Sequence, residues 1–200
     1  MLFTAFIFII FINHIILVDS SSASSFFNQQ QNELRAVNQA AGIPLPSQAQ
    51  ILGSLQHPFT IFEHYSICTY TGCQWDLDTS PATTFSPPDS GPYTNQWMQV
   101  YKDLGATQVC LTVRHVDGFS LWPSMSTNYS VESSNWRNGT GDVVRDFVAS
   151  ARAAGLSPCL YIILGFNVEA NHSGMPGSQY LDNQVLALTE LLTSYGQIDR

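Results

Sequence analysis

Basic residues are scarce in this chain. Only 7 of its 200 residues are Lys or Arg, against 15 Asp or Glu, so the formal net charge at pH 7 is -8. Because affinity for nucleic acid comes mainly from clustered Lys and Arg, this balance excludes a phosphate-binding surface of any size. Charged residues of both signs reach 11%, less than half the usual share of about 25%. Ser, Thr, Asn and Gln must therefore supply much of the polar surface.

Sequence patterns for metal, redox and dinucleotide chemistry are also missing. The four cysteines have no zinc-binding spacing and include no Cys-x-x-Cys pair. Cys68 and Cys73 are close enough along the chain to form a disulfide in an oxidising compartment, and we treat them as a candidate pair. Cys110 and Cys159 lie inside apolar runs, which is typical of buried thiols.

The amino terminus has the pattern of a secretory signal. Residues 2–18 are almost wholly apolar and precede the small residues 20–25, with a cleavage site after Ala23. We expect residues 1–23 to be a cleaved signal peptide. The alternative is a retained membrane anchor, although the apolar run is shorter than the roughly 20 residues that span a bilayer comfortably. No later segment is expected to cross a membrane.

Three sequons for N-linked glycosylation fit the secretory pathway. They begin at Asn128, Asn138 and Asn171. Between the leader and the first apolar strand, residues 24–56 are mostly polar, which suits a surface arm or a single short helix before the domain.

From residue 57 onward, apolar runs alternate with segments of helical periodicity. Hydrophobic residues make up 44% of the chain, enough for a well-buried core. Strand-like runs cover residues 59–62, 108–113 and 156–164. Helical spacing covers residues 96–104, 142–154 and 181–195, each followed by a glycine. The alternation predicts parallel βαβ units and an α/β fold.

Two α/β architectures fit this pattern, an open doubly wound sheet and a (β/α)8 barrel of the TIM type. No glycine-rich phosphate turn follows the first strand, so a dinucleotide-binding sheet is disfavoured. A barrel places its chemistry on the loops that follow the strands, and these loops hold the polar and aromatic residues of this chain. We therefore expect a barrel.

Histidines follow the first two predicted strands. His64 ends the first strand and His115 the second, so both imidazoles are expected at one rim of the sheet. The same loops are rich in aromatic residues, namely Tyr65, Tyr70, Trp75, Phe119, Trp122 and Tyr129. Aromatic faces and fixed polar groups together suit a carbohydrate pocket. The alternative is that the aromatics pack the loops together; we favour packing for Trp122 and the pocket for Trp75.

Two carboxylates near these histidines suggest a weaker hypothesis, an acid-base enzyme that uses Asp117 or Glu63. Asp117 precedes Gly118 and is more simply a turn residue that accepts backbone N–H groups. Glu63 immediately precedes His64, so strand alternation directs the two side chains to opposite faces.

Several long motifs carry a specific resemblance to a known family. They are TIFEHYSICTYTGCQWD (60–76), LTVRHVDGFSLWPS (111–124) and NWRNGTGDVVRDFV (135–148), with shorter matches at TNQW, TNYSV, AGLSPCLY and LLTSYGQID. Together they cover about residues 57–200. The chain closely resembles the first half of glycoside hydrolase family 29, the α-L-fucosidases.

The resemblance implies a barrel enzyme that removes terminal α-L-fucose from oligosaccharides or glycoproteins, in the lysosome or outside the cell. It also implies retention of configuration and no metal or organic cofactor. Retention requires two carboxyl groups about 5–5.5 Å apart. The family's nucleophile, an Asp at the end of the fourth strand, and its acid/base are expected beyond Arg200, so the 200-residue chain is expected to be inactive.

The resemblance also implies the residues that bind the sugar. His64 and His115 are expected to hydrogen-bond fucose hydroxyls and Trp75 to border the ring, with Gln74 and Tyr161 completing the set.

Three positions depart from the family pattern. Gln74 stands where Glu is common, Val116 replaces the second of two paired histidines, and Ile162 follows Tyr161 where a second tyrosine is frequent. Each lost polar partner costs about 1–3 kcal/mol of binding. The alternative function is therefore a catalytically silent relative that binds fucose or other glycans.

Overall fold

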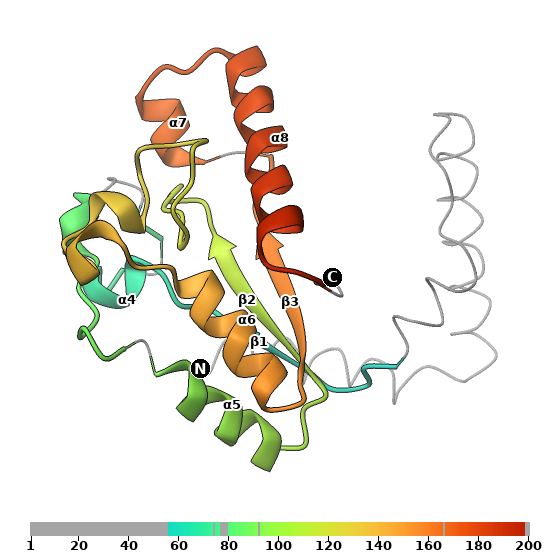
Figure 1. Ribbon diagram of the computed structural model, residues 1–200. Helices are drawn as coiled ribbons and strands as arrows, with labels where there is room; N and C mark the ends of the chain where they lie inside the picture. The colour runs from blue at the N-terminus through green and yellow to red at the C-terminus, as the bar shows by residue number, and fades with distance from the viewer. Residues whose placement is uncertain (1–55, 74, 77–79, 92, 166, 199–200) are drawn as a thin grey trace, which may run out of the picture. The chain divides into compact units, whose positions relative to one another are not determined.

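The computed structural model describes residues 56–73, 75–76, 80–91, 93–165 and 167–198. The unit that begins at His57 is an arrangement of alternating strands and helices (Figure 1). The expected signal peptide and all of the expected arm except Gln56 lie outside the described residues. Within the described ranges, no helix is long and apolar enough to cross a membrane.

Three parallel strands form the sheet. β1 (Thr60–Glu63), β2 (Gln108–Arg114) and β3 (Ser157–Ile162) lie in the order β1-β2-β3. Each strand lies within two residues of its predicted bounds, and the predicted parallel βαβ arrangement is confirmed.

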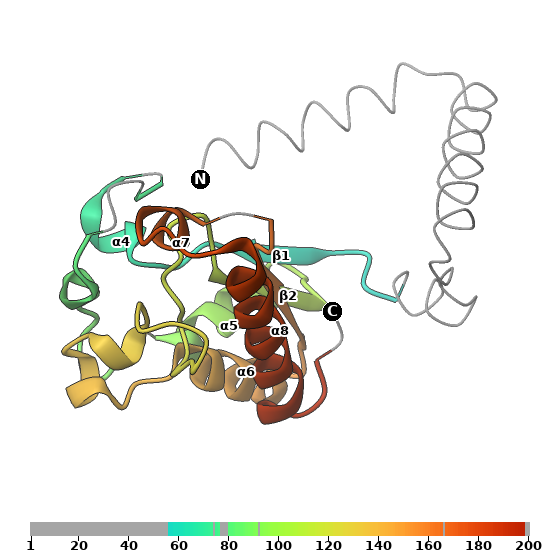
Figure 2. The same ribbon diagram turned by 90° about the horizontal axis from the view of Figure 1, so that it is seen from above.

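Three longer helices lie on one side of this sheet (Figure 2). They are α5 (Thr94–Asp103), α6 (Val143–Ala153) and α8 (Gly177–Ser194). The other helices are short and belong to the loops: α4 (Cys68–Thr71), α7 (Val168–His172), and the 3-10 helices η1 (Ala82–Thr84), η2 (Val131–Ser133) and η3 (Trp136–Gly139).

Helix α8 begins four residues earlier than the sequence predicts. The apolar period starts at Leu181, whereas the helix starts at Gly177, directly after Pro176. The first turn is polar and largely exposed, so hydrophobic periodicity could not detect it.

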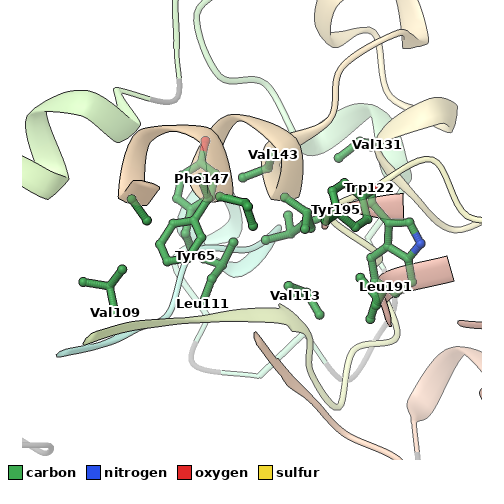
Figure 3. Packing of buried hydrophobic residues seen from close by; sticks show 14 of the residues in the cluster. Tyr65, Val109, Leu111, Val113, Trp122, Val131, Val143, Phe147, Leu191 and Tyr195 are labelled. Atoms are coloured by element: carbon green, nitrogen blue, oxygen red, sulfur yellow. The ribbon is translucent and has the colours of Figure 1, made fainter. Parts of the chain in front are cut away.

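The core lies between β2 and the helices. Val109, Leu111 and Val113 alternate along β2 and are fully buried. Figure 3 shows them facing Val143 and Phe147 of α6. Their alternation follows from the two-residue period of a strand, so every second side chain of β2 contributes to this core.

Asp142 fixes the start of α6. Its carboxylate caps the helix by accepting a hydrogen bond from the Arg145 backbone N–H at 2.9 Å. The same carboxylate accepts a hydrogen bond from the Tyr195 hydroxyl, just past the end of α8, at 3.0 Å. One side chain therefore ties the beginning of α6 to the end of α8.

The face of the sheet opposite the helices carries Phe62, Thr112 and Tyr161, and we call it the site face.

Strand β2 contains a β-bulge near its carboxyl end, where two of its residues lie opposite one residue step of β3. Thr112 pairs with Tyr161 but Arg114 pairs with Ile162, so Val113 is the extra residue of a β-bulge. Simple alternation would direct Arg114 to the site face. After the bulge, its guanidinium instead donates a hydrogen bond to Gln184 of α8.

The cysteine pairing differs from the prediction. Cys110 and Cys159 form a disulfide, whereas Cys68 and Cys73 are free thiols. The physical reason is the strand register, because Cys110 and Cys159 are direct partners on β2 and β3 with Cα atoms 4.2 Å apart. Cys68 instead starts α4, and its thiol lies 3.8 Å from the Asp117 carboxylate.

Alkylation of the unfolded, unreduced chain is expected to label Cys68 and Cys73 alone. Cys110 and Cys159 should react only after reduction, because their sulfurs are bonded to each other. Peptide mapping by mass spectrometry measures both steps. A linked peptide containing Cys68 and Cys73, or labelling of all four cysteines before reduction, would contradict this pairing.

Candidate functional site

Aromatic and imidazole rings from all three strands meet at the carboxyl end of the sheet. His64 directly follows β1, His115 directly follows β2, and Tyr161 is the penultimate residue of β3. The ring centroids of His64 and His115 are 5.4 Å apart, and those of His115 and Tyr161 are 6.3 Å apart. The predicted meeting of the two histidines at one rim is confirmed. Parallel strands cause it, since their carboxyl ends share one edge.

Phe62 is a fourth member of this group. Its ring lies 5.0 Å from that of His64 and 5.3 Å from that of Tyr161, measured between centroids. We call Phe62, His64, His115 and Tyr161 the ring cluster. Phe62 was not among the predicted site residues, although it lies two residues before His64 and therefore on the same strand face.

The ring cluster is accessible to a ligand. Phe62 is 39% exposed and Tyr161 38% exposed, and His64 is exposed as well. A partly exposed aromatic ring beside two imidazoles offers one apolar surface and several hydrogen-bonding nitrogens. These are the contacts that a sugar ring with its hydroxyl groups requires.

His64 favours its neutral form. Although the side chain reaches solvent, desolvation of the rest of the imidazole lowers its pKa from the usual 6.5, and the neighbouring His115 lowers it further. A neutral imidazole has one nitrogen that donates and one that accepts a hydrogen bond. It can therefore pair with a hydroxyl group in either direction.

Trp75 lies in the loop between α4 and η1. It is 54% exposed, and among the described residues its ring makes no ring contact with Phe62, His64, His115 or Tyr161. The next residue, Asp76, is buried and anchors the loop by accepting hydrogen bonds from the Ser80 backbone N–H at 2.7 Å and hydroxyl at 3.0 Å. Gln74, the other predicted binding residue of this loop, lies outside the described residues.

The two nearby carboxylates have structural partners. Asp117 is fully buried and accepts a hydrogen bond from the Phe119 backbone N–H at 2.7 Å, as its predicted turn role requires. Burial raises the pKa of Asp117, although this hydrogen bond acts to lower it. Glu63 accepts a hydrogen bond from Tyr101 of α5, on the helix side of the sheet. The predicted opposition of Glu63 and His64 is confirmed.

Most of the other loop aromatics pack together, as the alternative interpretation held. Tyr65, Phe119 and Trp122 are buried, and Trp122 donates a hydrogen bond from Nε1 to Glu190 at 2.8 Å. Packing is therefore the correct interpretation for Trp122. Phe85, which was not among the predicted loop aromatics, lies between Tyr65 and Phe119 with ring-centroid distances of 5.8 and 5.1 Å.

Val116 and Ile162, two of the positions that differ from the family pattern, lie in different parts of the structure. Val116 lies in the turn after His115, where its carbonyl accepts a hydrogen bond from Val168 N–H at 2.7 Å. Ile162 packs against the helix-side core. Alternation thus leaves Tyr161, and not its neighbour, on the site face.

A cavity of about 450 Å³ lies between the 125–128 loop and the connection from α7 to α8. Its lining carries no charged side chain and combines polar residues such as Asn128, Gln179 and Asn183 with Met125 and Met175. The ring cluster does not line this cavity. We assign the candidate site to the ring cluster because it combines imidazoles with exposed aromatic faces. Within the described ranges, no group of three His, Cys, Asp or Glu side chains could hold a metal ion.

The chain is similar to proteins of one family over most of its length. The α-L-fucosidase family model matches residues 59–199. Alpha-L-fucosidase 1 of Arabidopsis thaliana is 38% identical over 161 residues, which cover 78% of this chain and 30% of that protein. A solved structure of a glycoside hydrolase 29 family member from an unknown rumen bacterium is 37% identical, with a TM-score of 0.66 over 78% of this chain and 27% of that one.

These matches agree with the motif resemblance and extend it to the fold. The chain spans about 30% of the length of the Arabidopsis relative. On the extent and identity of these matches, the chain belongs to the α-L-fucosidase family, glycoside hydrolase family 29.

Proposed function

We propose that this chain is the amino-terminal part of a retaining α-L-fucosidase with a (β/α)8 barrel. Its substrate is terminal α-L-fucose on oligosaccharides or glycoproteins. The observation that carries the proposal is the 5.4 Å separation of the His64 and His115 rings at the ends of neighbouring parallel strands. Family membership supplies the chemistry.

The ring cluster suits fucose in particular ways. Fucose carries several hydroxyl groups and one methyl group, so its pocket needs hydrogen-bonding groups and an apolar contact. His64 and His115 supply the first, and Phe62 with Tyr161 supplies the second. Trp75, exposed in its own loop, borders the sugar from outside the cluster.

The catalytic carboxylates belong to a later part of the barrel. A retaining glycosidase needs a nucleophile and an acid/base about 5–5.5 Å apart. Asp117 and Glu63, the carboxylates nearest the histidines in the chain, are engaged with Phe119 and Tyr101. We therefore assign both catalytic roles to residues beyond Arg200, and the 200-residue chain alone is inactive.

A glycan-binding protein without catalysis is the second candidate function. Val116 favours it, because valine replaces a histidine of the family motif and cannot hydrogen-bond a hydroxyl group through its side chain. The ring cluster would still bind fucose in such a protein.

We further propose a secreted or lysosomal glycoprotein. Asn128, Asn138 and Asn171 are all exposed, as acceptors of N-linked glycans must be. The Cys110–Cys159 disulfide supports an oxidising compartment.

Extending the transcript past the Arg200 codon separates hydrolase from silent binder. We expect the next apolar strand to end in Asp-Gly, followed in a later loop by a second carboxylate. An apolar or amide residue in place of that Asp would leave glycan binding as the function.

The 200-residue chain should release no nitrophenol from nitrophenyl α-L-fucoside, because both catalytic carboxylates are assigned to residues beyond Arg200. If the chain did hydrolyse this substrate, and His115→Ala abolished the hydrolysis, the chain would already hold its catalytic groups.

Replacing either histidine is expected to weaken the binding of L-fucose. Each substitution His64→Ala or His115→Ala removes one hydrogen bond, worth about 1–3 kcal/mol, so the dissociation constant should rise roughly 5- to 150-fold. His115→Gln keeps a donor and an acceptor and should lose less. Calorimetric or NMR titration measures the affinity, and melting curves check the fold. Unchanged affinity in both alanine variants would exclude the ring cluster as the fucose site.

Acidification is expected to act on the fold through His64. The pKa of His64 lies below 6.5 in the folded chain, so the unfolded chain takes up this proton first as the pH falls. The free energy of unfolding should therefore decrease below pH 6.5 until His64 itself is protonated. An NMR titration should show His64 mostly neutral at pH 6.5, and His115→Ala should raise its pKa. A His64 pKa of 6.5 or higher in the unmodified chain would contradict this.

A further inference from the structure

The orientation of His115 depends on the bulge in β2. Thr112 lies on the site face as the partner of Tyr161. Strict alternation from Thr112 would direct Arg114 to the site face and His115 to the helix side. The extra residue Val113 reverses both directions, since a bulge shifts the following side chains by one position. Val113 and Arg114 then both belong to the helix side, and His115 lies beside Tyr161.

Arg114 lies on the helix side in a buried socket formed by Trp122, Ser126 and Gln184. It is 3% exposed. Nη1 donates a hydrogen bond to the Ser126 hydroxyl at 3.3 Å, and Nη2 donates one to Oε1 of Gln184. The guanidinium carbon lies 5.6 Å from the ring centroid of Trp122. These partners come from the loop after β2 and from α8.

The socket is itself held in place by Glu190 of α8. Its carboxylate accepts hydrogen bonds from Trp122 Nε1, from the Ser124 hydroxyl and from the Met125 backbone N–H, each at 2.8 Å. Ser124 and Ser126 share a further hydrogen bond of 2.7 Å. The 122–126 loop is therefore fixed to α8 around the Arg114 side chain.

A buried guanidinium restricts the backbone that carries it. Removing an arginine from water is costly unless its N–H groups are paired. The hydrogen bonds to Gln184 and Ser126 form only if Arg114 points toward α8, and strand alternation allows that direction only with the bulge. The residue after Arg114 must then point to the site face.

We propose that Arg114 is a positioning residue for the ring cluster. Its hydrogen bonds to Gln184 and Ser126 stabilise the β2 bulge, and the bulge directs the His115 side chain toward the sugar. The statement about the sugar rests on the proposed function, whereas the statement about the direction of His115 does not. Arg114 itself lies on the opposite side of the sheet from the ligand.

The direct test compares Arg114→Met with Arg114→Lys in the whole chain. Methionine keeps an apolar stem and loses every donor, so the bulge should relax and His115 should leave the site face. NMR contacts between the His115 and Tyr161 rings should then disappear, the pKa of His64 should rise toward its usual value, and L-fucose affinity should fall at least fivefold. Lysine keeps a buried donor and should restore the ring contacts.

Val148→Ala is the matched control, because it truncates a buried side chain of α6 and leaves the hydrogen bonds of Arg114 to Ser126 and Gln184 in place. It should lower the melting temperature while leaving the His64 titration, the ring contacts and the affinity unchanged. If Arg114→Met does not fold, Gln184→Leu removes one acceptor and keeps the charge, and it should weaken the same ring contacts.

Three outcomes are distinguishable. Loss of the ring contacts in Arg114→Met or Gln184→Leu, but not in Val148→Ala, supports the proposal. Intact ring contacts and an unchanged His64 titration in a folded variant overturn it. If the unmodified chain does not bind L-fucose, the proposed function fails, yet the ring contacts still decide whether Arg114 positions His115.

Discussion

Side-chain alternation along β2 gives the sheet one face that packs against the helices and one face that carries the ring cluster. Val109, Leu111 and Val113 pack against the helices, while the intervening residues line the face on which the ring cluster lies. β2 is also the only described strand with a partner on each side. Its alternation therefore sets which residues of β1 and β3 reach the site, through the register Phe62–Cys110–Cys159.

Local sequence patterns sufficed for the elements and for part of the site. Strand composition, helical period and terminal glycines located the sheet and the three longer helices, and strand ends located His64 and His115. Pairing between distant strands was not accessible in the same way. The Cys110–Cys159 bond joins residues 49 apart and depends on an exact register, as does the bulge at Val113. Neither the disulfide nor the bulge produces a recognisable pattern in the residues next to it along the chain.

The low charge content agrees with how the charged residues are used. Asp142 caps α6, Asp117 and Asp76 each accept backbone N–H groups in loops, and Glu190 fixes the loop after β2. Such bonds to an ionised group are stronger than those between neutral groups. Long loops can then hold a defined shape with few charges, and the aromatic residues Tyr65, Phe85 and Phe119 fill the space between them.

The two free thiols differ in exposure, so one of them is the better target for labelling. Burial raises the pKa of the Cys68 thiol, so it stays protonated and reacts slowly at neutral pH. Cys73 is exposed and lies two residues before Trp75 in the chain. A maleimide dye would therefore attach preferentially at Cys73, and its fluorescence would report events at Trp75 without any engineered substitution.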